Sequence, residues 1–257
     1  MINSYSKSAN MKTNKILGIT INLESRTSIL EKILLYIGKP TCFFHIVSLN
    51  PENLIATTES EIFKKVVETA QIKIVDGIGV VLAGRWLGVE TGERVTGVGL
   101  MEDLLKMASD RRLRVLMIGG KENLALRLAQ CYQEKYIEAK FNGIQGIVDI
   151  QDPSEDEEDK IFSIVTAYKP HLVFVAFGSP AQELWIERHK NKLTNCVAMG
   201  VGGAFDYLSG NVNRSPTFIQ KIGLEWLYRL VIQPWRWKRQ LRLLKFIWLI
   251  IKQKLKK

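Results

Sequence analysis

The chain has 257 residues, 46% hydrophobic and 24% charged, which is typical of a globular protein with one large domain and an appendage. Its three cysteines form an odd set without paired spacing, which argues against a disulfide framework or a zinc site. The formal net charge of +10 arises in the tail, where residues 221–257 hold 11 of the 36 basic residues and one of the 26 acidic residues. The rest of the chain has 25 basic and 25 acidic residues and so no net charge.

The first fifteen residues are polar, and no apolar segment of a secretory signal follows them. We therefore expect a disordered tail at 1–15 and a cytoplasmic protein. A short apolar stretch at 16–23 leads into a helix that Ser25 or Thr27 can cap and that Gly38-Lys39-Pro40 ends.

A buried strand is predicted at 42–47, and it runs into Ser48-Leu49-Asn50-Pro51. Asn50 is a favoured N-cap and Pro51 suits the first helical position, so Ser48 and Asn50 stand where a strand gives way to a helix. His45 lies in mid-strand without a His or Cys at metal-ligand spacing, and we interpret it as a core residue.

A second such junction follows the predicted strand 72–75, which ends at Asp76-Gly77 before a helical apolar spacing. In a parallel sheet, ligands bind in the crevice beyond the carboxyl ends of the strands. Arg94 brings a cation to the loop after the helix. A carboxylate and a guanidinium at this edge indicate proton abstraction beside a phosphate, and the structural alternative is an Asp-Gly turn with a surface arginine.

Further strands are predicted at 115–118, 141–148, 171–177 and 196–201. About six strands that alternate with helices predict an α/β fold over 16–212: a Rossmann-like, mostly parallel sheet with helices on both faces. Gly119 and Gly120 close one strand and could cradle a nucleotide, although no G-x-G-x-x-G is present.

The acid run at 155–159 favours the first turn of a helix behind Ser154 over a metal site, because carboxylates there oppose the helix dipole. No D-x-D element lies elsewhere. We expect neither a metal nor another cofactor.

The segment 213–257 differs in its residue pattern from the rest of the chain. Pro216 and Pro234 delimit one predicted helix, and a second carries an apolar row with basic residues opposite. Its longest uncharged run, 246–251, is far shorter than the roughly 20 residues that span a bilayer. The pattern predicts an appendage that lies on an anionic membrane surface. A broad apolar face argues against a nucleic-acid partner, while pairing into a homo-oligomer through that face stays open.

Five ordered blocks resemble the WecG/TagA/CpsF glycosyltransferases, family 26, between about residue 15 and about residue 240. The blocks are SLNPEN at 48–53, VDGIG to ERVTG at 75–97, FGSPAQE at 177–183, GVGGAFD at 200–206, and EWLYRL with QPWR at 225–236.

The resemblance implies a bacterial, metal-independent, inverting transferase of capsule, exopolysaccharide or teichoic acid synthesis, peripheral on the inner face of the cell membrane. It would move an N-acetylmannosamine-type sugar from a UDP donor to undecaprenyl-diphospho-N-acetylglucosamine. It implies that Asp76 is the catalytic base, that Ser48, Asn50 and Gln182 contact substrate, and that the tail arginines hold the diphosphate and close over the site: Arg229, Arg236 and Arg239. Gly202 and Gly203 either join the substrate site or only shape the last strand turn.

Three alternatives remain at this point. A transferase of the same family could use another UDP-hexose, since no residue is tied to one sugar. A nucleotide-binding membrane scaffold would bind UDP without catalysis. An oxidoreductase is disfavoured by the missing dinucleotide fingerprint.

Overall fold

The computed structural model describes residues 14–210, 212, 215–232, 234 and 237–256. Thirteen of the fifteen residues of the expected disordered tail lie outside this part of the chain. Lys15 already belongs to a strand. The apolar stretch 16–23 forms a small antiparallel hairpin, with β1 at Lys15–Ile16 and β2 at Ile19–Thr20.

A six-stranded parallel sheet forms the centre of the described chain, in the order β4-β3-β8-β7-β5-β6. The strands are β3 Phe44–Leu49, β4 Ile72–Val75, β5 Arg114–Gly119, β6 Lys140–Ile144, β7 Leu172–Ala176 and β8 Val197–Gly200. The prediction of about six strands is confirmed. After β3 the chain forms β4 at one edge of the sheet, and after β5 it forms β6 at the other edge. The direction therefore reverses at the centre of the sheet, which is where doubly wound folds bind ligands.

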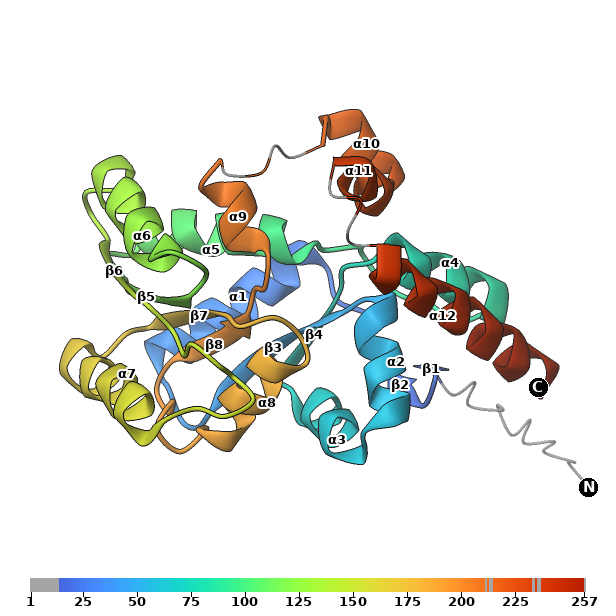
Figure 1. Ribbon diagram of the computed structural model, residues 1–257, viewed down its shortest axis with the longest axis horizontal. Coiled ribbons are helices and arrows are strands. Elements are labelled where there is room, and N and C mark those ends of the chain that lie inside the picture. Colours follow the sequence, from blue (N-terminus) through green and yellow to red (C-terminus); the bar gives the residue numbers. More distant parts are fainter. Residues whose placement is uncertain (1–13, 211, 213–214, 233, 235–236, 257) are drawn as a thin grey trace, which may run out of the picture.

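Helices cover both faces of the sheet (Figure 1). Successive side chains of one strand enter different layers. In β4, Ile72 and Ile74 pack in the layer that contains α1 Arg26–Gly38, α5 Gly97–Asp110, α6 Leu124–Lys135 and α9 Ala204–Leu208. Val75 packs with α2 Pro51–Glu59, α3 Glu61–Thr69 and α4 Ile78–Leu87. On the same side as α2, α7 Glu155–Tyr168 and α8 Ala181–Arg188 cover β5, β7 and β8.

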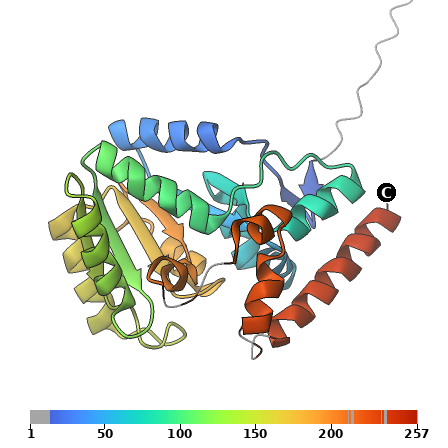
Figure 2. The same cartoon turned by 90° about the horizontal axis from the view of Figure 1, so that it is seen from above.

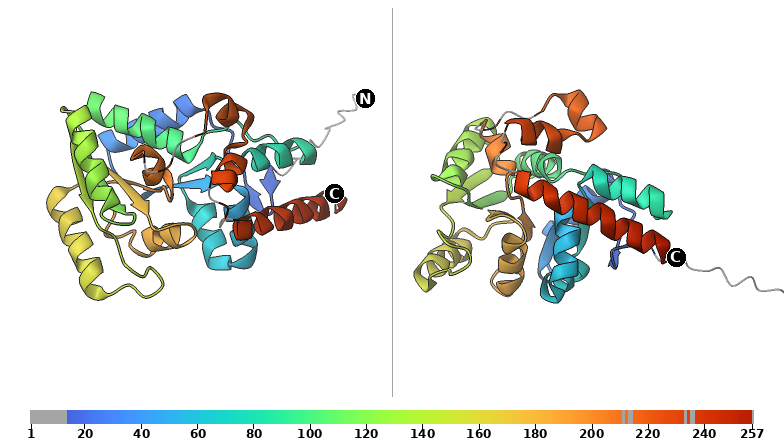
Figure 3. Two further views of the ribbon diagram at one scale, coloured as in Figure 1. Left: turned by 45° about the horizontal axis from the view of Figure 1, so that its top comes forward. Right: turned by 45° about the vertical axis from the view of Figure 1, so that its right-hand side comes forward.

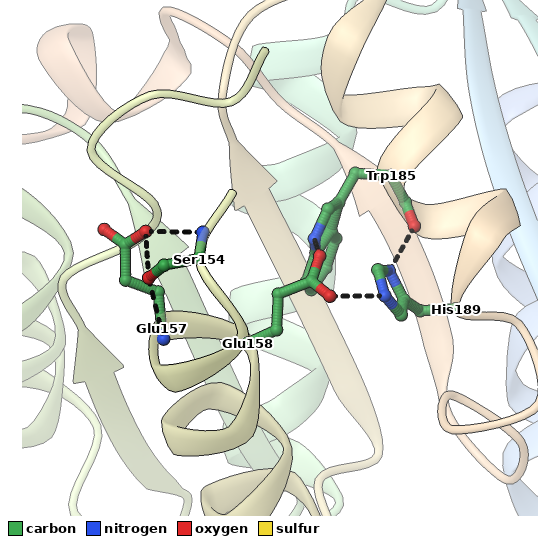
Figure 4. A network of polar contacts seen from close by, with 5 residues as sticks. All are labelled: Ser154, Glu157, Glu158, Trp185 and His189. Carbon is green, nitrogen blue, oxygen red and sulfur yellow. Dashed lines mark hydrogen bonds and ion pairs between the residues drawn. The ribbon is translucent and has the colours of Figure 1, made fainter. Parts of the chain in front are cut away.

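The acid run begins α7, as predicted. Ser154 and Glu157 form a capping box, and four carboxylates occupy the first turn. Glu158 accepts a hydrogen bond of 3.0 Å from Trp185 Nε1 and lies 3.1 Å from His189 Nε2, so it joins α7 to α8 (Figure 4). The run therefore has a structural role. Within the described ranges, no three His, Cys, Asp or Glu side chains gather to hold a metal ion.

The C-terminal segment forms three helices in its described part: α10 Thr217–Ile222, α11 Glu225–Ile232 and α12 Trp237–Leu255. The single helix predicted between Pro216 and Pro234 is wrong, because Gly223 adopts φ +77° and ends α10. In the described part of the chain no helix combines the length and the apolarity that a membrane crossing needs.

The last helix, α12, lies along α4 and packs on α2 (Figures 2 and 3). Phe246 and Ile250 are buried in the same apolar cluster as Val47 and Leu49 of β3. The apolar row predicted from the sequence faces outward and is exposed at Trp237, Leu241, Leu244, Trp248, Ile251 and Leu255. One helix thus presents apolar side chains both to the core and to the surface.

Candidate active site

A cleft of about 810 Å³ lies beyond the carboxyl ends of β3, β4, β7 and β8. One wall comes from the loops that follow these strands, with side chains from 48–53, 76–79, 94–98, 178–183 and 200–204. The other wall comes from α10, α11 and α12. The appendage therefore completes a site that the sheet alone leaves half open.

Asp76 and Ser48 approach one point at the floor of this cleft. The register pairs Leu49 with Val75, so β3 and β4 end side by side, and the backbone N–H of Asp76 donates to Leu49 O at 3.0 Å. A Cβ on Gly97 would lie 3.3 Å from Ser48 Oγ and 3.5 Å from Asp76 Oδ2. Glycine at the start of α5 therefore leaves space beside the hydroxyl and the carboxylate.

Asn50 lines the same cleft and is the N-cap of α2, as predicted: its Oδ1 accepts from Asn53 N at 2.9 Å. The close approach of Gly77 holds this junction against β4, because a Cβ there would come within 2.8 Å of Pro51 Cδ. The two strand ends, which were predicted separately, are thus packed closely together, with Pro51 against Gly77.

Arg94 lies at the cleft, but its guanidinium hydrogen-bonds main-chain oxygens. Its Nε donates to Asp76 O at 3.0 Å and its Nη1 donates to Gln220 O at 3.0 Å. Arg94 and Asp76, which the sequence predicted to be neighbours, are therefore brought together through the backbone carbonyl of Asp76. The same side chain ties the tip of β4 to α10 of the appendage.

Gln182 also makes its contacts within the protein. Its Oε1 accepts from Gly178 N at 3.2 Å and from Gly202 N at 3.0 Å, and its Nε2 donates to Glu183 Oε1 at 2.8 Å. The side chain is buried. It joins the loops after β7 and β8, and so it positions Gly202, which lines the cleft together with Gly203.

Gly119 and Gly120 do not line this cleft. Gly119 ends β5 and Gly120 follows it, and β7 separates this strand from β8 in the sheet. A Cβ on Gly119 would lie 2.9 Å from the Phe177 ring, so close packing accounts for glycine there. Their predicted nucleotide contact stays a prediction.

Two residues that the sequence analysis did not assign lie in the cleft wall. Glu183 is 1% exposed, and burial raises the pKa of its carboxyl, an effect that donors on Gln182 and Ser179 oppose in part. Asn53 donates to Ser48 O at 2.7 Å and accepts from Ser179 Oγ at 2.7 Å, which links the loops after β3 and β7. Glu183 and Asn53 both belong to the motif blocks, and this membership is the sequence signal that could have identified them as site residues.

Of the predicted tail arginines, Arg229 lies in α11 and Arg239 in α12, with side chains outside the described part, and Arg236 is outside it altogether. Trp226 and Leu230, which lie on either side of Arg229 in α11, line the cleft. The helix that carries Arg229 is therefore part of the cleft wall.

A doubly wound parallel sheet with a cleft outside its carboxyl edge defines a ligand-binding α/β protein of the Rossmann-like class. Residues 14–257 match the model of the glycosyl transferase WecG/TagA/CpsF family. The chain belongs to this family and is a glycosyltransferase.

Curated relatives cover most of the chain. Proteins named N-acetylglucosaminyldiphosphoundecaprenol N-acetyl-beta-D-mannosaminyltransferase are 30% identical in Bacillus subtilis (strain 168), over 81% of this chain and 79% of the relative, and 32% identical in Bacillus spizizenii, over 80% and 78%. A protein of the same name from Staphylococcus aureus (strain NCTC 8325) is 30% identical over 87% of this chain and 85% of its own. These relatives share one activity by name.

Proposed function

We propose that this glycosyltransferase moves an N-acetylmannosamine-type sugar from a UDP donor to undecaprenyl-diphospho-N-acetylglucosamine. The observation that carries the proposal is the shared name of relatives that align with about four fifths of the chain. The Asp76 carboxylate beside the Ser48 hydroxyl in an 810 Å³ cleft supports a reaction at that point. The product would serve the synthesis of a cell-surface polymer.

Asp76 is the proposed base. It takes the proton from the acceptor hydroxyl as that oxygen forms a bond to the anomeric carbon. The bond between this carbon and the donor phosphate oxygen breaks, and its electron pair leaves with UDP. The half-buried position of Asp76 at the end of β4 supports this role. General base catalysis contributes about 10² to 10⁴ in rate.

Charge that develops on the departing UDP needs positive partners, and guanidinium groups bind phosphates through paired donors. We assign this role to Arg229, Arg236 and Arg239. The presence of α11 in the cleft wall supports the assignment. Ser48 and Asn50 contact substrate from the other wall, while Gln182 acts through the Gly202 loop that it holds.

The appendage is proposed to rest on the anionic inner face of the membrane. Exposed apolar side chains on all three of its helices support this, among them Phe218, Trp226 and Trp248. The basic residues of 221–257 supply the attraction, at about 1 kcal/mol each near such a surface. The active-site cleft, which the same helices wall, would then open near the lipid-linked acceptor.

The test uses the full-length chain with UDP-N-acetylmannosamine and a short-chain lipid-diphospho-N-acetylglucosamine acceptor. UDP release that depends on the acceptor, with a product heavier by one N-acetylhexosamine unit, is the expected result. UDP-N-acetylglucosamine and UDP-glucose serve as control donors. Faster transfer from a control donor would overturn the choice of sugar. UDP binding without acceptor-dependent release from any donor would support the scaffold alternative.

A further inference from the structure

The cleft has an apolar arm that extends from the sheet edge between α4 and α12. On α4 it is lined by Ile78, Leu82 and Trp86, which follow one another at intervals of four residues and so share one helix face. These three residues span about 12 Å along the helix axis. On α12 the lining comes from Leu243, Phe246, Ile247 and Ile250.

The walls of this arm are held in place from both ends. A Cβ on Gly79 would lie 3.9 Å from Phe246 Cε1, so α12 packs closely against the start of α4. At the other end, Lys254 Nζ donates to Trp86 O at 2.9 Å. Two helices from distant parts of the sequence therefore run side by side, as Figure 3 shows.

The arm is apolar yet only partly covered by protein. None of the α4 and α12 residues that line it in the described chain is charged. Leu82 is 54% exposed, Trp86 49% and Ile247 47%. Large apolar side chains gathered along a groove gain free energy when a hydrocarbon covers them, whereas a sugar or a nucleotide would lose hydration there without gaining hydrogen bonds.

The position of the groove relative to Asp76 indicates its occupant. Between Asp76 and the groove stands the N-terminus of α4, where Gly77 offers no side-chain cap, and backbone N–H groups at a helix start favour an anion. The polar floor, this helix start and the apolar arm thus follow one another in space. The acceptor named in the relatives has the same order of parts: sugar, diphosphate and polyprenol.

We propose that the groove between α4 and α12 binds the first isoprene units of the polyprenyl chain of the acceptor. This inference rests on the proposed function and adds a hydrocarbon subsite to it. The chain enters at the Trp86 end and continues from there into the bilayer. The subsite orients the acceptor. Because a diphosphate joins the sugar to the bound hydrocarbon, holding the hydrocarbon in the groove presents the sugar to Asp76 in one orientation.

The experiment compares two acceptors with the same N-acetylglucosamine-diphosphate head, one with a single isoprene unit and one with three, each below its micelle concentration and without vesicles. The full-length wild type should have the lower KM for the longer acceptor. The double variant Leu82→Asn and Ile247→Asn should lose roughly tenfold in kcat/KM for the longer acceptor and clearly less for the shorter one, which covers only the start of the groove.

The matched control is Leu35→Asn with Ile62→Asn, which replaces exposed apolar side chains of α1 and α3, away from the groove. This control should keep the chain-length preference. An equal preference in the groove variant and the wild type would overturn the subsite. Absence of transfer by the wild type to either acceptor would instead reject the proposed function. Failure of the subsite and failure of the proposed function are therefore distinguishable.

A second measurement does not depend on the variants. A three-isoprene acceptor with a photoreactive terminal group should label peptides of α4 and α12 in the wild type, as mapped by mass spectrometry. A phosphatidylglycerol with acyl chains of similar length should not prevent this labelling when present at equal concentration. Labelling confined to other helices, or equal competition by the phospholipid, would show that the groove is not a prenyl site.

Discussion

At the scale of single residues, Asp76→Asn is the direct test of the proposed base. The carboxamide keeps the size of the side chain but cannot accept the proton, so kcat should fall by about 10² to 10⁴. The circular dichroism spectrum should be unchanged. Acceptor-dependent UDP release measures the effect, and Asp152→Asn, at an exposed position, is the control. Near-normal turnover of the Asp76 variant would remove this residue from the mechanism.

His45 provides a residue-scale test of stability. Its ring is fully buried in β3, neither ring nitrogen has a hydrogen-bond partner among the described residues, and burial lowers its pKa from 6.5 to about 3. Between these values the unfolded chain binds the proton and the folded chain does not. Stability from this group is therefore complete above pH 6.5 and is lost as the pH falls toward 3.

The expected outcome is a difference of about 1.4 kcal/mol in the free energy of unfolding between pH 7.5 and pH 5.5 that His45→Leu removes. Urea unfolding of both proteins at the two pH values measures it. The comparison with the variant cancels contributions from other histidines. If the two proteins responded equally to pH, His45 would not be buried in its neutral form.

The residues at the strand ends could be predicted from the sequence, whereas their partners could not. Buried apolar runs that stop at Ser48-Leu49-Asn50 and at Asp76-Gly77 locate the ends of two parallel strands, and topology then brings those ends together. The guanidinium of Arg94 binds the carbonyl oxygen of Gln220, 126 residues away. Main-chain acceptors have no side-chain signature in a sequence, so contacts of this kind appear only in the folded structure.

At the scale of elements, the junction between α10 and α11 is the sharpest test of how the appendage meets the core. A Cβ on Gly223 would come within 2.5 Å of Ile78 Cβ, and its φ of +77° is strained for other residues. Gly223→Ala should therefore displace α10 from α4, at a cost of about 1 to 3 kcal/mol in unfolding free energy, and raise the KM for the acceptor.

Gly210→Ala is the matched control, because Gly210 has a φ of +76° and no atom lies within 4 Å of its added Cβ. It carries the backbone strain without the collision. Thermal unfolding and initial transfer rates of both variants separate the two effects. Equal losses in the two variants would show that contact with Ile78 has no part in seating the appendage.

Element prediction succeeded where a segment was long and periodic. The sheet strands other than β6 are mostly apolar, and the capping of α7 by Ser154 follows the sequence signature. The two-residue strands β1 and β2 are too short for any period. The single helix expected before Pro234 failed because its apolar spacing continues through Gly223, although that glycine was the signal for an end.

At the scale of the whole molecule, the concentration of positive charge in the tail predicts salt-dependent membrane binding. Lys252→Gln with Lys256→Gln removes two exposed cations of the C-terminal end. At about 1 kcal/mol each, affinity for phosphatidylglycerol-containing vesicles should fall roughly 30-fold. Sedimentation with vesicles of phosphatidylglycerol and phosphatidylcholine measures the change.

The control for this prediction is Lys106→Gln with Lys140→Gln, which alters the net charge equally at exposed positions on α5 and β6. It should leave vesicle binding within twofold of the wild type. An equal loss in both variants would mean that net charge, and not the placement of charge in the tail, governs the attraction. No loss in either would leave the apolar surface as the main contact.

The burial of Phe246 and Ile250 means that the appendage and the α/β core share one apolar interior. The boundary predicted at residue 212 stays a prediction, but shortening the chain there would strip a cover from α2 and α4. Such a fragment would be prone to aggregate, so inactivity in it would say little about lid closure. Point variants in the intact protein are therefore the better test of closure. Any change that alters lipid contact by α12 must also preserve the packing of this helix against the core.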